Sequence, residues 1–328
     1  MLSMIARTAH APLNALAFVG RHGTICIAAS LLIGIALPVL AAQFRPFLEE
    51  AILALLTLAF LKIGFRALGD ELRAPETILL SAAIAMFVLP AAVFVALALS
   101  GVSQSYPGLY LALFIALAVP PITAVPIFSS LLGLPGPIAL AFLLVCMAAA
   151  PFAAAIHGEL FFNSLLGSID SVGIGLRLLG FLAAAAGIAF VVQRLVGEAR
   201  LARAKSHLDG VNVLAMFVFA VAIMDGFGVA LVAKPLFIFA LLVATFGLAI
   251  GQMAIMRAVL HKIDPEKATS IALASGLRNM GLLVASIGIE LPETTWLWFV
   301  VGQFPIFFMP WIIELFRRNR LVNKQRDV

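Results

Sequence analysis

Charged residues are scarce in this chain: Asp, Glu, Lys and Arg make up only 11% of its 328 residues. Soluble domains carry roughly 25%, so a soluble globular protein is excluded. Cysteine is rarer still, and because Cys26 and Cys146 both lie in apolar runs, we expect free thiols and no disulfide framework. The chain is instead 63% hydrophobic, with a mean hydropathy of +1.15. Its repeated apolar runs of about twenty residues predict an all-α polytopic protein of the lipid bilayer.

Charged and turn-forming residues divide the apolar sequence into ten predicted spans. These cover residues 24–42, 50–66, 77–100, 107–133, 136–157, 171–195, 209–228, 233–257, 267–289 and 293–316. The run at 24–42 is long enough to remain a span, which disfavours a cleaved signal peptide. Residues 1–23 are predicted to form an amphipathic leader, and residues 317–328 a basic tail.

Most of the 21 Lys and Arg residues lie on one side of this arrangement. With ten spans, both chain termini lie on that side, together with the basic loop from Arg194 to Lys205. Because positively charged loops stay in the cytoplasm, both termini are predicted to be cytoplasmic. The net charge of +5 is therefore a topology signal, and nucleic acid is not an expected partner.

A polar stretch at 158–170 divides the ten predicted spans into two sets of five. The first set occupies residues 24–157 and the second residues 171–316, with 158–170 as the connector. An odd number of spans in each half gives the halves opposite orientations, which is the inverted-repeat arrangement of many secondary transporters. The halves share no convincing residue-level repeat, so this symmetry depends on span order and on where the spans are interrupted.

The fourth span of each half contains residues that interrupt a helix. Pro120 and Pro121, followed by Pro126, interrupt the first, while Gly276 and Gly281 bracket a polar patch in the second. Proline removes a backbone donor and leaves carbonyl groups without helical partners. Such groups are tolerated at membrane depth only where protein or water surrounds them. Matching interruptions in two halves therefore predict a central binding site.

One cation, Arg278, lies in the middle of the predicted span at 267–289. A charge at this depth costs several kcal/mol, so it normally faces protein, water or an anion. Two broken helices that cross would also direct the positive ends of their dipoles to one point. The residues thus predict a transporter of a small organic anion, with Arg278 as its cationic group. A purely structural role, in which broken-helix carbonyls or Asp225 hold Arg278, is the alternative.

Other function classes need residues that these spans do not carry. A membrane enzyme requires paired carboxylates, a metal cluster or a nucleophile with its base, so we expect neither an enzyme nor a cofactor. A proton-coupled antiporter requires an intramembrane Asp or Glu, and the sequence has none near either break. A channel, or a transporter like the auxin efflux carriers, remains open because similar crossed helices recur there.

Two motifs give the chain a resemblance, over roughly residues 24–316, to the bile acid:sodium symporter family. Where the family's fourth span carries Pro-Gly-Gly-Thr-Ala-Ser-Asn, this chain has Pro120-Pro121-Ile122-Thr123-Ala124-Val125-Pro126. Where its ninth span carries Glu-X-Gly-X-Gln-Asn, this chain has Ala274-Ser275-Gly276-Leu277-Arg278-Asn279. The chain therefore looks like a divergent, bacterial-type member, which implies a multi-pass protein of the bacterial inner membrane.

The resemblance implies ten helices in two inverted five-helix repeats, with broken fourth and ninth helices that cross. It also implies a panel of helices 1, 2, 6 and 7 and a core of helices 3–5 and 8–10, which move against each other. Thr123 and Asn279 stand where the family places substrate contacts. With Ser275, Gly276 and Arg278, they are the predicted substrate-binding residues.

The residues that would bind sodium in the family are replaced here. Ungapped alignment puts Val125, Pro126, Ala139, Leu143, Ala274 and Arg278 at the family's sodium-ligand positions. Arg278 would repel a nearby cation by several kcal/mol at an effective dielectric constant of about 20. We therefore expect no metal site, and we hypothesise that the guanidinium takes the place of the cation. A sodium-coupled symporter with other ligands is the alternative.

Several polar residues also have structural interpretations. Thr123 could bond back to its own helix, and Asn279 could join neighbouring helices. Asp225 is predicted to be a solvated helix terminus, while His157 and Glu159 are predicted to mark the edge of the fifth span.

Overall fold

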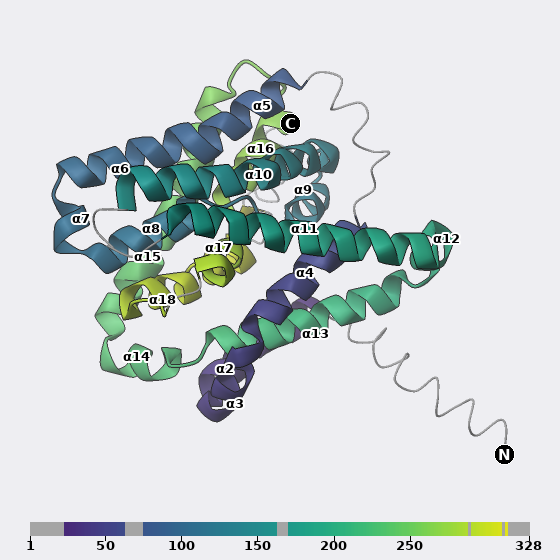
Figure 1. The fold of residues 1–328 in the computed structure, drawn as a ribbon, viewed down its shortest axis with the longest axis horizontal. Helices are drawn as coiled ribbons and strands as arrows, with labels where there is room; N and C mark the ends of the chain where they lie inside the picture. Colours follow the sequence, from purple (N-terminus) through teal and green to yellow (C-terminus); the bar gives the residue numbers. More distant parts are fainter. Residues whose placement is uncertain (1–22, 63–74, 163–169, 288–289, 310–311, 314–328) are drawn as a thin grey trace, which may run out of the picture. The chain divides into compact units, whose positions relative to one another are not determined.

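The computed structural model describes residues 23–62, 75–162, 170–287, 290–309 and 312–313. Within these ranges the chain is almost entirely helical and has no β-strand (Figure 1). The predicted leader at 1–23, apart from its last residue, and the predicted tail at 317–328 lie outside the described residues.

Helices of membrane-spanning length and composition are numerous in the described part of the chain. Five pass this test: Glu76–Leu99, Gly136–Phe162, Ser171–Val196, Ser206–Ile223 and Pro235–Val259. A bent pair, Ala29–Ala36 with Pro38–Leu61, makes a sixth candidate. The prediction of a helical, multi-pass membrane protein is thereby confirmed, whereas the arrangement of ten spans in inverted repeats remains a prediction.

The chain divides into two compact units, each formed from two separate stretches of sequence. Unit 1 comprises Met1–Ile63 and Gly180–Pro235, and unit 2 comprises Gly64–Leu179 and Leu236–Val328. One boundary falls within helix α11 (Ser171–Val196), and another falls at the start of α15 (Pro235–Val259).

Unit 1 is built around one long helix, α13 (Lys205–Ile223). Its other elements are α2 (Gly23–Ala36), α3 (Pro38–Phe44), the 3-10 turn η1 (Arg45–Phe47), α4 (Leu48–Lys62), α12 (Glu198–Arg203), α14 (Phe227–Ala233) and the C-terminal part of α11. Helix α13 packs against α2, α3 and α4, as Figure 1 shows. Gly34 permits close approach to α13, because a Cβ there would lie 3.1 Å from the Val221 Cα.

The first chain reversal in unit 1 differs from the predicted one. The sequence places it between the spans at 24–42 and 50–66, but the helix breaks at Leu37, with a bend of 107° between Ala36 and Pro38. Proline disfavours helical backbone in the residue before it, and Leu37 accordingly leaves the helical region. The predicted gap is instead helical, since η1 follows α3 directly and leads into α4.

Asp225 lies just after the end of α13 and is partly exposed, as predicted for a solvated helix terminus, and the structure adds a partner. Its carboxylate accepts a hydrogen bond from Arg45 Nη1 at 2.8 Å, so it forms an ion pair within unit 1. The partners are 180 residues apart in sequence, which is why local pattern alone gave no sign of the pair.

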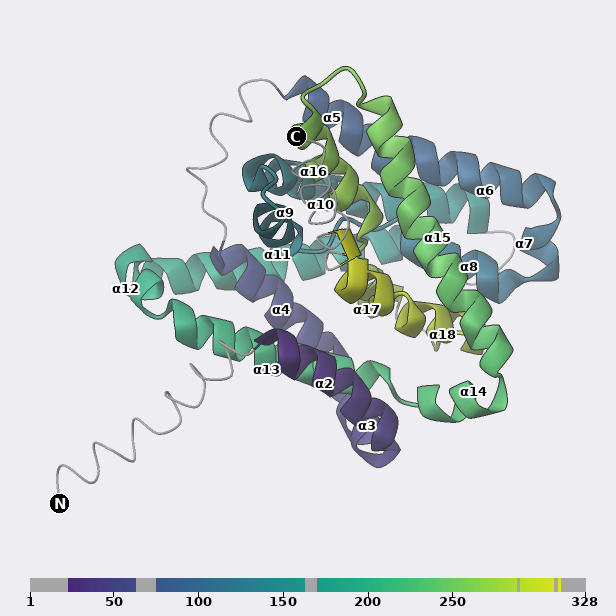
Figure 2. The ribbon, with the colours of Figure 1, turned by 180° about the vertical axis from the view of Figure 1, so that it is seen from behind.

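Unit 2 holds the two interrupted helices. Its elements are α5 (Glu76–Ala83), the π-helix η4 (Ile84–Val88), α6 (Leu89–Leu99), α7 (Val102–Ser105), α8 (Pro107–Leu117), α9 (Val125–Leu131), α10 (Gly136–His157), the π-helix η5 (Gly158–Phe162), α15, α16 (Pro265–Gly276), α17 (Met280–Ile287) and α18 (Glu293–Val301), with the N-terminal turns of α11. Helix α10 packs against α5, α9 and α16, while α17 and α18 pack against α8. Figure 2 shows α16 and α17 separated by their break, with α15 beside α16.

His157 lies inside unit 2 rather than at the edge of a span. It is 2% exposed, bonds through Nε2 to the Met86 carbonyl at 2.9 Å, and packs among aromatic rings that include Phe94 and Phe161. Helix α10 also continues through η5 to Phe162, so the first residues of the predicted connector at 158–170 are helical. From sequence, a titratable residue in an apolar run predicts the membrane–water interface. In the structure, His157 instead has the Met86 backbone carbonyl as its polar contact.

The α2–α13 contact gives a testable prediction. In Gly34→Ala the new Cβ would lie 2.8 Å from the Met224 Cβ, so the two helices must separate. We expect a loss of about 1–3 kcal/mol, as for other overpacked sites, and a lower melting temperature in detergent. Gly180→Ala is the matched control, since its Cβ meets no atom within 4 Å. Equal melting temperatures for the two variants would contradict the packing described.

Candidate functional site

The two helix breaks of unit 2 meet and pair through their backbones. Helix α8 ends at Leu117 and α9 begins at Val125, while α16 ends at Gly276 and α17 begins at Met280. Between them, Pro121 and Arg278 form an antiparallel bridge. We call residues 118–124 and 277–279 the crossover.

Backbone hydrogen bonds flank this bridge on both sides. The Ile122 N–H donates to the Leu277 carbonyl at 2.8 Å, and the Asn279 N–H donates to the Pro120 carbonyl at 2.9 Å. Interrupted helices leave donors and acceptors that must be satisfied away from water. Here each interrupted segment supplies hydrogen-bond partners for some of the backbone donors and acceptors that the other leaves free.

The predicted helix-breaking residues contribute in different ways. Pro120 and Pro121 lie in the extended segment of the crossover, but Pro126 lies in the first turn of α9, where proline favours helix initiation. Gly276 is the last residue of α16 and Gly281 is the second residue of α17. A Cβ on Gly276 would lie 2.6 Å from the Ala249 carbonyl oxygen, so this glycine permits α16 to approach α15.

Arg278 is buried at the crossover, with 3% of its surface exposed. Its Nε–H donates to Gln252 Oε1 at 2.8 Å, and its Nη1 donates to the Val119 carbonyl at 2.9 Å. Its Nη2 donates to the Ala85 carbonyl at 2.8 Å, and the Met86 sulfur lies 3.4 Å from Nη1. One side chain thereby connects α15, the crossover and the π-helix η4.

The π-helix has a specific role in this arrangement. A π-turn changes the hydrogen-bond register of a helix and often occurs at functional sites. Two successive carbonyls of η4 accept side-chain donors: Ala85 accepts from Arg278, and Met86 accepts from His157. The Leu89 N–H bonds to the Ile84 carbonyl, five residues back, and Pro90 has no N–H. The Ala85 and Met86 carbonyls therefore lack helical donors and can accept from side chains.

The guanidinium of Arg278 has no carboxylate partner among the residues that the structure describes. Asp225, the alternative partner considered from sequence, pairs instead with Arg45 in unit 1. All the acceptors around Arg278 are neutral: two carbonyl oxygens, an amide oxygen and a thioether. The site is a buried positive charge that dipoles solvate and that no counterion from the described ranges neutralises.

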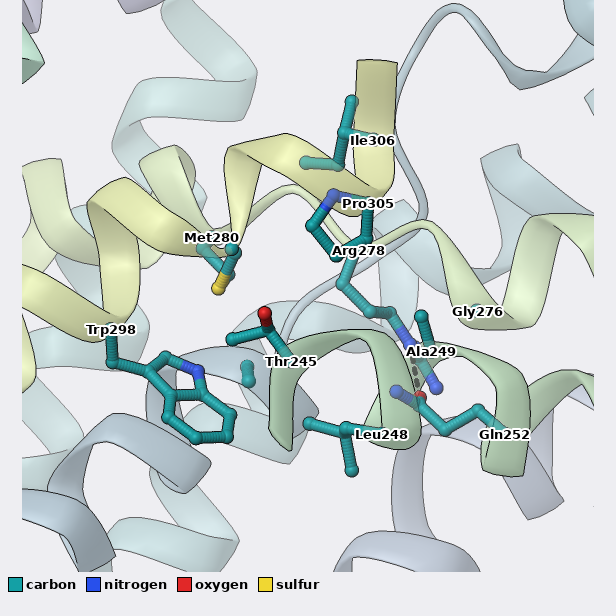
Figure 3. A pocket seen from close by; sticks show the side chains of 12 residues that line it. Thr245, Leu248, Ala249, Gln252, Gly276, Arg278, Met280, Trp298, Pro305 and Ile306 are labelled. Carbon is teal, nitrogen blue, oxygen red and sulfur yellow. Dashed lines mark hydrogen bonds between the residues drawn. The ribbon is translucent and has the colours of Figure 1, made fainter. Parts of the chain in front are cut away.

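A pocket opens beside this charge (Figure 3). Its empty volume is about 320 Å³, including the space at its mouth. Its polar lining comes from Thr245, Gln252, Arg278 and Trp298, and its apolar lining includes Leu248, Met280 and Ile306.

Sequence reasoning missed three of these residues. Thr245 and Gln252 come from α15 and Trp298 comes from α18, two helices that it treated only as apolar spans. The available signal was Gln252, a polar amide in the last third of the predicted span at 233–257.

The structure places the other predicted binding residues in different surroundings. Gly276 lines the pocket with Arg278, whereas Thr123, Ser275 and Asn279 are not among its lining residues. Ser275 is fully buried, and its hydroxyl donates to the Ala272 carbonyl at 2.7 Å, with the Gln252 carbonyl 3.3 Å away. Thr123 and Asn279 are half-buried at the crossover, and neither side chain has a hydrogen-bond partner within the described part of the chain.

Known proteins give no further guidance to the chemistry of the site. No protein-family model matches the chain, and no curated protein matches its sequence. Within the described ranges, no three His, Cys, Asp or Glu side chains gather into a group that could hold a metal ion. The function must therefore be inferred from the crossover, the buried guanidinium and the pocket.

The contacts of Arg278 predict a strong effect of Arg278→Lys on stability. A lysine cannot reach Gln252, Val119 and Ala85 together, so at least one buried acceptor loses its donor, at a cost of about 1–3 kcal/mol. We expect a clearly lower melting temperature in detergent. Arg177→Lys is the control, because Arg177 makes one bond, from Nη1 to the Ile287 carbonyl at 3.1 Å, which an ammonium can retain. Similar melting of both variants would show that the three-way contact contributes little.

Proposed function

We propose that this protein is a secondary transporter of a small organic anion, operating by alternating access without sodium coupling. The observation that carries the proposal is the guanidinium of Arg278, buried where two broken helices cross and without a counterion among the residues that the structure describes. Buried ions are costly unless they are paired, so intramembrane charges are normally functional. An organic anion is the ligand that this charge would favour.

The electrostatic gain from such a ligand is substantial. Two opposite charges about 5 Å apart attract by about 3 kcal/mol at an effective dielectric constant of about 20. The same charge disfavours a cationic ligand by a comparable amount. Neutral dipoles already stabilise the guanidinium, so the anion adds charge neutralisation rather than completing the fold.

The two units support the wider architecture that we propose: ten helices in two inverted repeats, as in the bile acid:sodium symporter family. Unit 1 contains the predicted spans 1, 2 and 7 and most of span 6, while unit 2 contains spans 3–5 and 8–10. This matches the division into panel and core that the resemblance implies. Alternating access would then be a movement of unit 2 relative to unit 1, in a bacterial inner membrane with both termini cytoplasmic.

The loss of sodium coupling is supported by the residues at the family's ligand positions. Val125, Ala139 and Ala274 are apolar and fully buried, so their side chains offer no oxygen ligand. Arg278 instead binds carbonyl oxygens of two elements and an amide oxygen of a third, as a bound cation would. We therefore propose that the guanidinium is a built-in replacement for the ion.

Sodium-independent uptake tests this proposal. The full-length protein is reconstituted in liposomes, and counterflow of radiolabelled benzenesulfonate and pyruvate is measured in sodium and in choline buffers. Benzenesulfonate stays ionised, so it does not cross the bilayer as a neutral acid. We expect saturable counterflow with initial rates that agree within about twofold, because the charge that orders the crossover is covalently attached.

Three results would contradict the proposal. Uptake that depends steeply on sodium would show that the transporter is coupled to sodium. Electrical current without counterflow would indicate a channel. Arg278→Gln must also lose uptake while it elutes as a monodisperse protein in detergent. Full uptake by that variant would show that the positive charge has no part in transport.

A further inference from the structure

We propose that the pocket beside Arg278 is the subsite for the anionic group of the substrate, with Gln252 and Trp298 as its principal donors. The substrate class that fits is a small monoanion, a carboxylate or sulfonate, with an apolar body. This inference rests on the proposed transport function and adds a location, two binding residues and a ligand class to it.

Gln252 presents donors to the pocket because its orientation is determined by Arg278. An arginine side chain has no acceptor, so the amide oxygen of Gln252 must face the Arg278 Nε–H, as the 2.8 Å contact shows. The amide nitrogen then points away from the guanidinium with two N–H groups. Neither N–H has a hydrogen-bond partner among the residues described, and the residue lines the pocket with 3% of its surface exposed.

Trp298 supplies a second donor without a partner. The residue is 3% exposed, and its indole Nε1 is buried with no hydrogen-bond partner in the described part of the chain. Tryptophan can only donate, and a buried donor without an acceptor is destabilising. Figure 3 shows the indole nitrogen on the edge of the ring turned toward Thr245, a neighbouring lining residue. An anionic oxygen in the pocket would satisfy this donor.

The remaining polar groups give the pocket a positive character. The contacts of Arg278 use its Nε–H, both Nη1 hydrogens and one Nη2 hydrogen, which leaves one of its five N–H groups. The Thr245 hydroxyl donates to the Leu242 carbonyl at 2.9 Å, so its proton is already used. No acidic side chain lines the pocket. Donors and one positive charge therefore face the ligand.

Size and apolar lining restrict the ligand further. The empty volume of about 320 Å³ includes the open space at the mouth, so the pocket favours a small molecule. Leu248, Met280 and Ile306 provide apolar surface for its body. A single guanidinium matches a single negative charge. Benzenesulfonate fits this description, and the neutral benzenesulfonamide is its near-isosteric comparison.

Gln252→Glu separates ligand binding from folding. The new carboxylate still accepts from the Arg278 Nε–H, but it removes both amide donors and neutralises the guanidinium. We expect the unliganded variant to melt at the wild-type temperature or above. Its affinity for benzenesulfonate, from the ligand-dependent melting shift of the full-length protein, should fall at least about tenfold.

Trp298→Phe removes the indole N–H and retains an aromatic ring in the same place. We expect affinity for benzenesulfonate to fall by about 10–100-fold, the loss of one hydrogen bond to a charged group. Trp296→Phe, on the same helix but outside the pocket lining, is the matched control and should bind as wild type does. The sulfonamide should stabilise none of these proteins.

The outcomes distinguish the subsite from the transport function. Binding of benzenesulfonate that is weakened in Gln252→Glu and Trp298→Phe, but not in Trp296→Phe, supports the assignment. If the wild-type protein shows counterflow and both pocket variants bind benzenesulfonate with unchanged affinity, the subsite assignment is wrong but the proposed function stands. Equal binding of the sulfonamide would overturn it too. A wild-type protein that neither binds nor transports any organic anion would overturn both.

Discussion

The burial of one positive charge is the constraint on which the architecture of unit 2 depends. An ion at this depth must be surrounded by dipoles, and a regular helix has none to spare because its carbonyls are used internally. Arg278 finds them where regular helix stops: Val119 lies in the break of the fourth predicted span, and Ala85 lies in a π-turn. The irregular helix segments and the buried Arg278 charge therefore depend on each other. Without the breaks the guanidinium would lack acceptors, and without the guanidinium the freed carbonyls would lack a donor.

Features that depend on local sequence could be predicted. Long apolar runs predict the spans at 77–100, 136–157, 171–195 and 233–257, because a span of this length must be helical in a bilayer. Features that depend on distant partners could not. His157 became an interior residue because η4 offers it the Met86 carbonyl, 71 residues away in sequence. The bend at Leu37 was missed for a different reason: Pro38 lay within apolar sequence, and the charges at 45–50 gave a stronger but misleading boundary.

The same distinction applies to the site. Arg278 and Gly276 were found from sequence because a charge and a glycine stand out in an apolar helix. Gln252 and Trp298 were not found from sequence. Gln252 lines the pocket beside Arg278, to which it is hydrogen-bonded across 26 residues, and Trp298 reaches the pocket through packing. Ser275 differs from these: its hydroxyl lies close to the charge in sequence, but it donates to the Ala272 carbonyl of its own helix and does not line the pocket. A polar residue in a span needs a hydrogen-bond partner, and only the identity of that partner shows whether the contact is structural.

A fixed cation has an energetic consequence that a bound ion does not. Bound sodium adds its own gradient to the driving force, whereas a guanidinium that returns unchanged in every cycle adds none. Under the proposed function, a monoanion that moves alone carries its charge across the membrane, at about 2.3 kcal/mol per 100 mV. An inside-negative potential then favours export over uptake, and uptake requires exchange against another anion. Under the proposed function, Arg278 in place of the ion keeps a positive charge at the crossover while the sodium gradient is lost as a driving force.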